Sequence, residues 1–244
     1  MSLHIGPKNS KSDYFLHQTK ITSISENESV RDQGVYFTNN LKFHEHIRLI
    51  TIKANRTLFS IIRSLKTNNP QILLHLFKTY VLPILDFASP VFNPYHKNDI
   101  IALEKVQKNF VRILFSRSNP KVKEIPKYET LLNKFNLTSL RIRRLKADLI
   151  LFHKLLHNQV KINHNNSFLL KETSTRGEIY KFLVPSCSNQ IRHNSFFIRV
   201  PNQYSKLPDE IKRSSPSRFK KLIEFYDLTQ IYDTNPKHRY SPKH

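Results

Sequence analysis

The residues that could carry catalysis in this chain are its aspartates, and they are dispersed. Phosphodiester chemistry uses two metal ions held by converging carboxylates. No two aspartates are adjacent, and the candidates lie far apart, at Asp13, Asp32, Asp86, Asp99, Asp148 and Asp209. Asp86 stands out because it lies between apolar Leu85 and Phe87, where an aspartate more often caps a helix or pairs with an arginine. We therefore expect no catalytic residue in this chain, and no metal or cofactor bound by it.

Two histidine pairs have spacings that could serve a metal ion, but neither completes a site. His153 and His157 are four residues apart, which places them on one helical face. A zinc-dependent hydrolase would have glutamate directly after the first histidine, where this chain has Lys154. His44 and His46 supply too few ligands for a tetrahedral site. With only three glycines in the chain, no glycine-rich phosphate-binding loop is present either.

The charge of the chain points to a polyanionic partner. It carries 40 Lys and Arg against 18 Asp and Glu, a formal net charge of +22. A charge of this size repels itself, and nucleic acid is the first candidate to neutralise it. Solubility alone is a weaker explanation, because acidic residues serve it better. The single cysteine, the absence of a signal-like N-terminus and the lack of a long apolar run predict an intracellular protein, nuclear or cytoplasmic, with no membrane partner.

The first forty residues read as short strands, and the pattern becomes helical from about residue 41. Strands are expected at 3–5, 14–17, 20–24 and 34–37. A sheet this small cannot stand alone, so it must pack on the helices that follow or leave an exposed apolar face. We expect that a chain starting near Asn39 folds independently and is more soluble.

Basic residues lie opposite the apolar face of the first predicted helix. Apolar residues recur every three or four positions from Phe43 to Leu65, which marks one buried face. The residues expected on nucleic acid are Lys53, Arg56, Arg63 and Lys66, followed by Lys105, Lys108 and Arg112 on the third helix. Such charges hold a duplex by its phosphates without reading its sequence. The alternative is that they form an ordinary solvated face.

Further elements are expected along the rest of the chain. Asn69 and Pro70 read as the cap and first residue of a helix, which Pro83 ends or kinks. Residues 87–95 read as an extended connection, 98–114, 128–135, 139–156 and 218–228 as helices, and 180–184 and 190–193 as strands. The positive charge at the start of the helix at 139–156 opposes the helix dipole unless an acidic group lies nearby.

Ordered short segments along the chain resemble one known family. They read LHIG (3–6), DQGV (32–35), LKFHEHI (41–47), KANR (53–56), YVLPILDFASPVF (80–92), LEKVQK (103–108), TRG (175–177), SFFIRV (195–200), LPDE (207–210) and FKKL (219–222). This order is similar to the end of the reverse transcriptase domain in non-LTR retrotransposons of the jockey-like, LINE type. The resemblance implies that the catalytic aspartates, with their Mg²⁺, belong to a palm that precedes this segment, and that Gly34, Val35 and Tyr36 lie in a primer-grip-like turn. The chain departs from the family in having no tryptophan, with Phe92 and Tyr204 at two positions where relatives commonly have it.

These observations predict a mainly α protein with a small N-terminal antiparallel β remnant and a looser C-terminal segment. The expected parts are residual palm strands (1–40), a helical thumb-like domain (41–158) and a basic C-terminal segment with a disordered tail (159–244). The expected function is that of a truncated RNA-directed DNA polymerase that binds an RNA–DNA hybrid or duplex backbone and is inactive by itself. Its partner would be nucleic acid, with or without an upstream polymerase half. The alternative is a domesticated, non-enzymatic nucleic-acid-binding or protein-interaction module.

Overall fold

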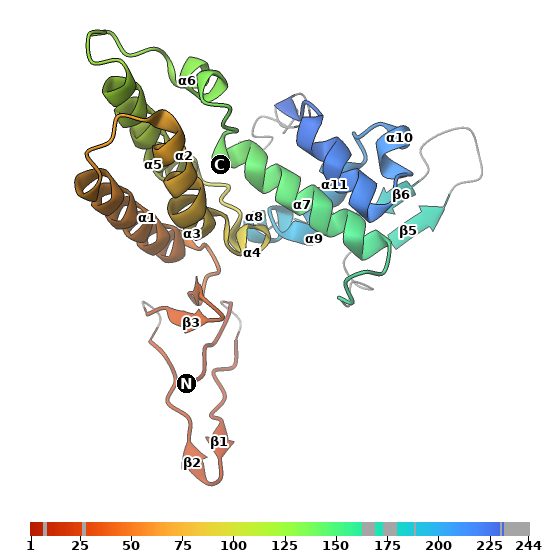
Figure 1. The fold of residues 1–244 in the computed structure, drawn as a ribbon. Helices are drawn as coiled ribbons and strands as arrows, with labels where there is room; N and C mark the ends of the chain where they lie inside the picture. The colour runs from red at the N-terminus through yellow and green to blue at the C-terminus, as the bar shows by residue number, and fades with distance from the viewer. Residues whose placement is uncertain are drawn as a thin grey trace, which may run out of the picture. The chain divides into compact units, whose positions relative to one another are not determined.

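The computed structural model describes residues 1–6, 9–25, 28–162, 169–172, 180–187, 189–229 and 231. The fold is mainly helical, with short pairs of antiparallel strands, which confirms the predicted class (Figure 1). The chain divides into two compact units, Met1–Arg141 and Ile142–His244. We refer to them as unit 1 and unit 2.

The N-terminal strands of unit 1 form two separate hairpins. β1 (Phe15–Leu16) pairs with β2 (Thr19–Lys20), and β3 (Val30–Asp32) pairs with β4 (Val35–Phe37). Both hairpins turn through two residues of positive φ, the second through Gln33 and Gly34, as the type I′ turns of tight hairpins require. The strand expected at 3–5 is not formed; Ser2 makes an isolated bridge to Ser23 instead.

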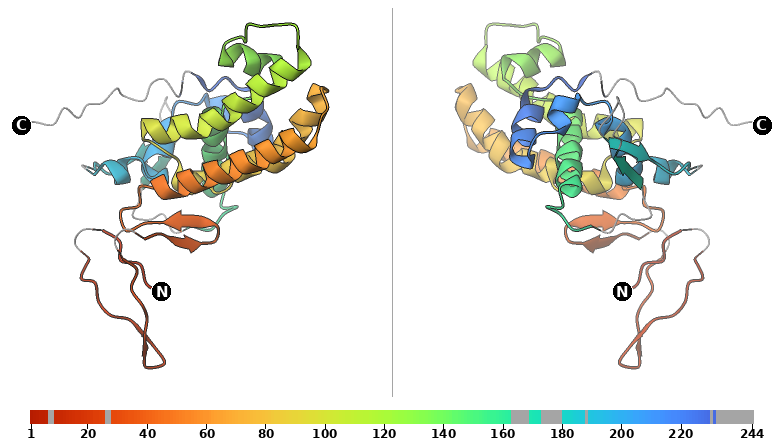
Figure 2. Two further views of the ribbon diagram at one scale, coloured as in Figure 1. Left: turned by 90° about the vertical axis from the view of Figure 1, so that its left-hand side faces the viewer. Right: turned by 90° about the vertical axis from the view of Figure 1, so that its right-hand side faces the viewer.

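The two hairpins differ in how much apolar surface they bury. Phe15 and Leu16 at the first hairpin are each 63% exposed, whereas Val35 in the second is 4% exposed. Figures 1 and 2 show the first hairpin beyond the second, away from the helices of unit 1. The expected uncovered apolar surface therefore lies at the first hairpin and at Ile5, which is 45% exposed, and does not include Val35. The second hairpin belongs to the core, so a chain starting near Asn39 would lose a buried part of unit 1.

The helices of unit 1 enclose one apolar core. They are α1 (His44–Ser64), α2 (Pro70–Leu76), the π-helical turn η1 (Phe77–Val81), α3 (Leu82–Asp86), α4 (Ser89–Phe92), α5 (Lys97–Ser118) and α6 (Tyr128–Lys134). α1 and α5 run side by side (Figure 2, left), and their buried faces meet in this core. Phe77 stacks on Phe110 with ring centroids 3.9 Å apart, which fixes η1 against α5.

Proline positions explain two departures from the expected elements of unit 1. Pro83 lacks an N–H and would clash with the carbonyl four residues earlier in a regular helix. The wide turn η1 precedes it, so the helical path continues into α3 without a break. The expected extended stretch at 87–95 contains the short helix α4, because Pro90 falls in its first turn, where no N–H is needed.

Unit 2 is built around most of α7 (Leu140–Leu156). Its other elements are β5 (Leu169–Glu172), β6 (Tyr180–Leu183), α8 (Gln190–His193), α9 (Phe196–Tyr204), α10 (Asp209–Lys212) and α11 (Pro216–Phe225). The core of this unit joins Leu149 and Phe152 of α7 to residues such as Tyr204 and Phe219. The stretch at 190–193, expected as a strand, is a helical turn because the side chain of Asn189 accepts a hydrogen bond from the N–H of Ile191.

The boundary between unit 1 and unit 2 lies near the start of α7, between Arg141 and Ile142, whereas the boundary expected from the sequence lies after this helix. The sequence pattern placed the helix at 139–156 in the helical domain that ends at residue 158. In the structure, the apolar face of α7 from Leu145 onward packs on the C-terminal elements. The pattern of α7 showed that one face is buried but carried no information on its partner. The expected disordered tail lies outside the described residues.

Candidate nucleic-acid interface

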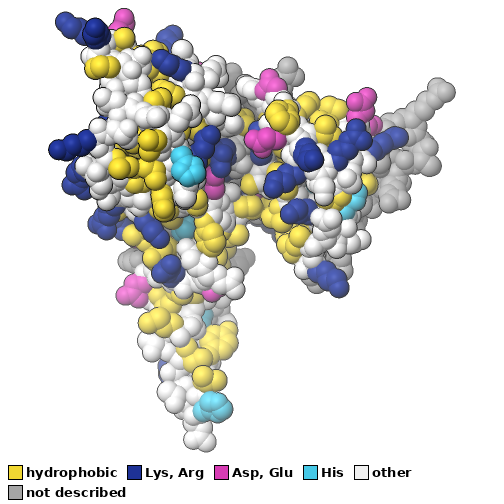
Figure 3. Space-filling model, in the orientation of Figure 1, with side chains coloured by type: hydrophobic (Ala, Val, Ile, Leu, Met, Phe, Trp, Pro, Cys, Tyr) yellow, Lys and Arg dark blue, Asp and Glu magenta, His cyan; other side chains and the backbone are white. Residues whose placement is uncertain are grey.

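The first candidate surface is a set of cations that we call the α1 basic row: Lys53, Arg56 and Arg63 on α1, and Lys66 just past the last residue of the helix, Ser64. All four side chains are exposed, while Ala54 and Leu58 between them are buried. At about 100° per residue, Arg56 and Arg63 lie opposite the buried face of the helix and Lys53 lies on its flank. Figure 3 shows Lys and Arg side chains gathered along the edge of unit 1 where Figure 1 places α1.

The electrostatic surroundings of the α1 basic row leave its charge uncompensated. The one acidic residue of α1, Glu45, accepts two hydrogen bonds from Arg48, of 2.8 and 2.7 Å. These hydrogen bonds lower the pKa of Glu45 and hold it as a carboxylate. Among the described residues, no acidic group forms an ion pair with any member of the row. The row is therefore free to attract an anion.

The second predicted set, which we call the α5 basic row, consists of Lys105, Lys108 and Arg112. All three are exposed. The guanidinium of Arg117 on the same helix donates hydrogen bonds to α1, at 2.8 Å to the carbonyl of Leu65 and 2.6 Å to that of Ile62. At about 100° per residue, the row lies roughly 120–180° around α5 from Arg117. The structure therefore does not bring the two rows together: the α5 row points away from α1.

The primer-grip-like residues lie at the second hairpin, beside the start of α1. The N–H of Tyr36 donates to Nδ1 of His46, 3.3 Å away, and the two rings are also in contact. Burial lowers the pKa of His46 to about 4, so its ring is neutral and can accept this bond. Gly34 has φ +89°, and a Cβ there would lie 3.0 Å from the ring of Phe87. The turn is therefore fixed to the helices by Gly34 and Tyr36, while Val35 is buried.

The aspartates have local structural partners that account for most of them. Asp13 pairs with Lys20, Asp99 with His44, Asp148 with Arg199 and Asp209 with Lys212. Asp86 is half-buried at the end of α3. Within the described ranges, no three His, Cys, Asp or Glu residues come close enough together to hold a metal ion.

The histidine pair on α7 has a structural role at its first member. Nε2 of His153 donates to the carbonyl of Ser214 at 2.9 Å, and Nδ1 accepts from the hydroxyl of Tyr204 at 2.7 Å. The ring also stacks on Phe219, with centroids 3.8 Å apart. Burial lowers the pKa of His153 to about 4. Because both ring nitrogens are engaged, His153 cannot pair with His157 as a metal ligand in this conformation.

One acidic group meets the need predicted for the start of α7. Glu104 of α5 accepts a hydrogen bond of 2.7 Å from the backbone N–H of Arg141 and another of 2.9 Å from the hydroxyl of Tyr128. A carboxylate at this position satisfies a free N–H of the helix terminus and offsets the basic residues of its first turn. The sequence pattern indicated that such a group was needed but not which residue supplied it.

A hollow between α2 and α6 was not predicted from the sequence. Lys78 and Lys134 line it from opposite sides. These lysines are 56 positions apart and follow no shared pattern, so no signal in the sequence could have joined them. The hollow can therefore be recognised only in the tertiary structure.

The comparisons with known proteins give one distant relative. An uncharacterized protein of Caenorhabditis elegans is 25% identical over 130 residues, which is 53% of this chain and 64% of the worm protein. No family model matches the chain, and no solved structure matches it. In the part of the chain that the structure describes, no helix is both long and apolar enough to cross a membrane.

Proposed function

We propose that this chain holds an RNA–DNA hybrid, or a similar duplex, by its phosphate backbone through the α1 basic row. The observation that carries the proposal is the row itself: Arg56 and Arg63 lie opposite the buried face of α1, Lys53 lies on its flank and Lys66 lies just past its end. All four are exposed, and the one acidic residue of the helix is already paired to Arg48. From Lys53 to Arg63 the row extends about 15 Å along the helix. Duplex DNA presents one charge per about 1.7 Å of axis, so the row can meet several phosphates. The resemblance to the thumb of non-LTR reverse transcriptases supports the same partner.

Contacts of this kind position a duplex rather than read it. Lys and Arg bound to phosphate oxygens carry no base information, so affinity should be nearly independent of sequence. Arg63 is partly oriented, because its Nε donates to the carbonyl of Phe59 at 3.2 Å and leaves the rest of the guanidinium free for a second partner. The proposed role is therefore a grip on the backbone, without sequence preference.

The experiment is a salt series of hybrid binding, with two variants of equal charge. The first variant is Lys53→Gln/Arg56→Gln/Lys66→Gln in the α1 basic row. The control is Lys105→Gln/Lys108→Gln/Arg112→Gln in the α5 basic row. Fluorescence anisotropy with a labelled hybrid gives the slope of log affinity against log salt. Each lost phosphate contact should reduce the slope by about 0.9 on B-DNA, and by a similar amount here, so the first variant should lose about 2–3 in slope.

Two results would contradict the proposal. A wild-type affinity that does not change with salt would exclude backbone contacts of this kind. An equal loss in both variants would mean that net charge, and not the α1 basic row, sets the affinity. We expect the control to retain most of its slope, because the α5 basic row points away from α1.

We also propose that this chain does not polymerise DNA by itself. The support is the pairing of Asp13, Asp99, Asp148 and Asp209 with neighbouring basic groups, and the lack, among the described residues, of three metal-ligating side chains close together. A primer-extension assay on an RNA template with Mg²⁺ tests this. Extension by the purified chain would overturn this reading of its acidic residues.

A further inference from the structure

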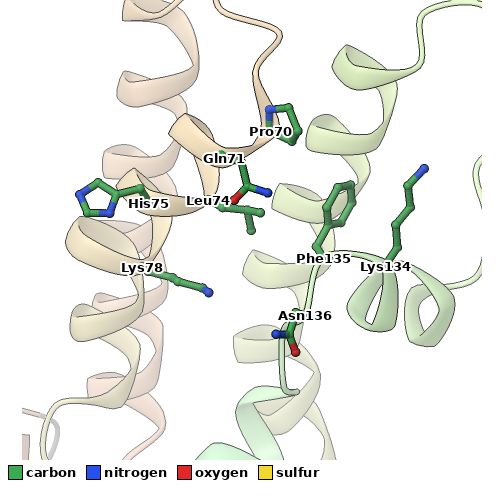
Figure 4. A pocket seen from close by; sticks show the side chains of 8 residues that line it. All are labelled: Pro70, Gln71, Leu74, His75, Lys78, Lys134, Phe135 and Asn136. Atoms are coloured by element: carbon green, nitrogen blue, oxygen red, sulfur yellow. The ribbon is translucent and has the colours of Figure 1, made fainter.

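The hollow between α2 and α6 lies within unit 1 and has a volume of about 540 Å³. Figure 4 shows Gln71, Leu74 and Lys78 on the α2–η1 side, extending toward Phe135 and Asn136 at the end of α6. His75 also borders the hollow, but its ring points away from it in this view. The volume falls within the range of small-ligand sites, about 300–1,000 Å³.

Local structure fixes both walls of the hollow. On one side, Asn69 caps α2 by accepting a hydrogen bond from the N–H of Gln71 at 2.9 Å. On the other side, α6 ends in a left-handed residue, Asn136, with φ 50°. The N–H of Leu137 then bonds to the carbonyl of Leu132 at 2.9 Å, the closing bond of a Schellman turn. Both walls are therefore ordered without a ligand.

Packing on α5 sets the spacing between the walls. Phe77, directly before Lys78, stacks on Phe110 of α5. On the opposite wall, the ammonium of Lys134 lies 4.6 Å from the ring centroid of Phe115, also on α5. The two lysines thus belong to opposite walls of the hollow. In Figure 4, Lys134 lies beyond Phe135 and its side chain extends away from Lys78.

The chemistry of the lining combines positive charge with an apolar floor. Lys78 and Lys134 are exposed, and no described acidic residue forms an ion pair with either. No Asp or Glu lines the hollow. Leu74 and Phe135 form a floor that is 7% and 8% exposed, and the exposed amides of Gln71 and Asn136 lie beside it. The positive charge of the site disfavours cations. Its lining favours an anionic ligand that also carries a planar group able to form hydrogen bonds.

We propose that this hollow binds a nucleotide. Its phosphate binds to Lys78, whose side chain extends toward the hollow, and Lys134 adds a second positive charge from beyond Phe135. The base rests against Leu74 and meets the amides of Gln71 and Asn136, which can donate to and accept from a base edge. The same chemistry is offered by a free nucleotide and by the phosphorylated end of a strand. The site lies on α2, η1 and α6, so it is separate from the three cations of the α1 basic row that lie on α1 itself, Lys53, Arg56 and Arg63.

The experiment is calorimetric titration of the full chain with AMP, adenosine and inorganic phosphate. The test variant is Lys78→Gln/Lys134→Gln, and the matched control is Lys121→Gln/Lys123→Gln, which removes two exposed lysines of the loop before α6. We expect AMP to bind, to bind about tenfold or more weakly to the test variant, and to bind the control unchanged. Adenosine and phosphate should each bind at least about tenfold more weakly than AMP. Circular dichroism confirms that both variants are folded.

Three results would overturn the proposal: no binding of AMP, equal weakening in both variants, or phosphate binding as tightly as AMP. A 5′-phosphorylated single strand decides the source of the nucleotide. Competition between this strand and AMP assigns the site to a strand end, and failure to compete assigns it to a free nucleotide; both results support the site. Loss of duplex affinity in the α1 variant with unchanged AMP binding would separate the two surfaces, whereas a parallel loss of AMP binding would show that the hollow is not an independent site.

Discussion

Acidification should destabilise both units of this protein, because each contains one buried neutral histidine. Burial lowers the pKa of His46 in unit 1 and of His153 in unit 2 to about 4. Each Nδ1 accepts a hydrogen bond, from the N–H of Tyr36 and the hydroxyl of Tyr204 respectively. A second proton on the ring would occupy Nδ1 and break that bond. Nε2 of His46, moreover, has no hydrogen-bond partner among the described residues.

The size of the effect follows from the difference in pKa between the folded and unfolded chain. An unfolded histidine has a pKa of about 6.5, so it binds a proton before the folded one does. The contribution of these histidines to the free energy of unfolding is therefore fully present above pH ~6.5 and decreases as the pH falls from ~6.5 to ~4. Below pH ~4 the two histidines cause no further loss. Between pH 7 and pH 5, each unit should lose about 2 kcal/mol of its free energy of unfolding. The full loss, reached below pH ~4, is about 3.4 kcal/mol for each histidine.

The measurement is peptide-resolved hydrogen–deuterium exchange at increasing urea, at pH 7 and pH 5. Peptides from α5 and α9 report the free energy of unfolding of the two units separately. His46→Phe should remove most of the pH-dependent loss in unit 1 and none of it in unit 2, although it lowers stability at pH 7. The rest of the loss in unit 1 comes from His96, whose pKa burial also lowers. His193→Gln, which replaces an exposed histidine of unit 2, is the control and should keep the wild-type loss.

A direct titration guards against variants that fold poorly. In the wild-type chain, the ring C–H signals of His46 and His153 should stay at their neutral positions at pH 5 in ¹H–¹³C spectra. Titration of both rings near pH 6.5, or equal stability of both units at pH 7 and pH 5, would refute the reasoning.

Three further outcomes are expected. Gly34→Ala should cost about 1–2 kcal/mol in urea unfolding, because the residue has φ +89° and the new methyl group meets an aromatic ring at 3.0 Å; an unchanged midpoint would exclude this close approach. Tyr204→Phe should cost about 1–3 kcal/mol, since it leaves the buried Nδ1 of His153 without its 2.7 Å partner; a loss below about 0.5 kcal/mol would argue against that bond. A chain that begins at Ser29 should keep the helices of unit 1 as protected from hydrogen exchange as in the full chain, whereas one that begins at Asn39 should not; equal protection in both would place the second hairpin outside the core.

Local patterns in the sequence predicted most of the helices and their termini. The apolar repeat of α1 predicted its buried face, and with it the exposed positions of Lys53 and Arg56. Asn69 and Pro70 predicted the start of α2. These signals depend on neighbours within one or two turns, so a single sequence contains them in full.

Short elements were harder to predict, because two local preferences compete in them. Residues 190–193 are too few to show a clear hydrophobic period. The side chain of Asn189 caps this segment and stabilises a helical turn. Pro90 read as part of an extended connection, yet it occupies the first turn of α4. In both cases a single capping or proline position outweighed the apolar pattern.

Only the tertiary structure decided which surfaces come together. The sequence determined a basic, mainly helical chain with cations opposite its buried faces. It did not determine that the α1 and α5 basic rows point apart, that α7 packs with the C-terminal elements, or that Lys78 and Lys134 line one hollow. The physical reason is that helical periodicity fixes the direction of a side chain only about its own helix axis. Which helix lies opposite is set by core packing between residues such as Phe77 and Phe110, far apart in the chain.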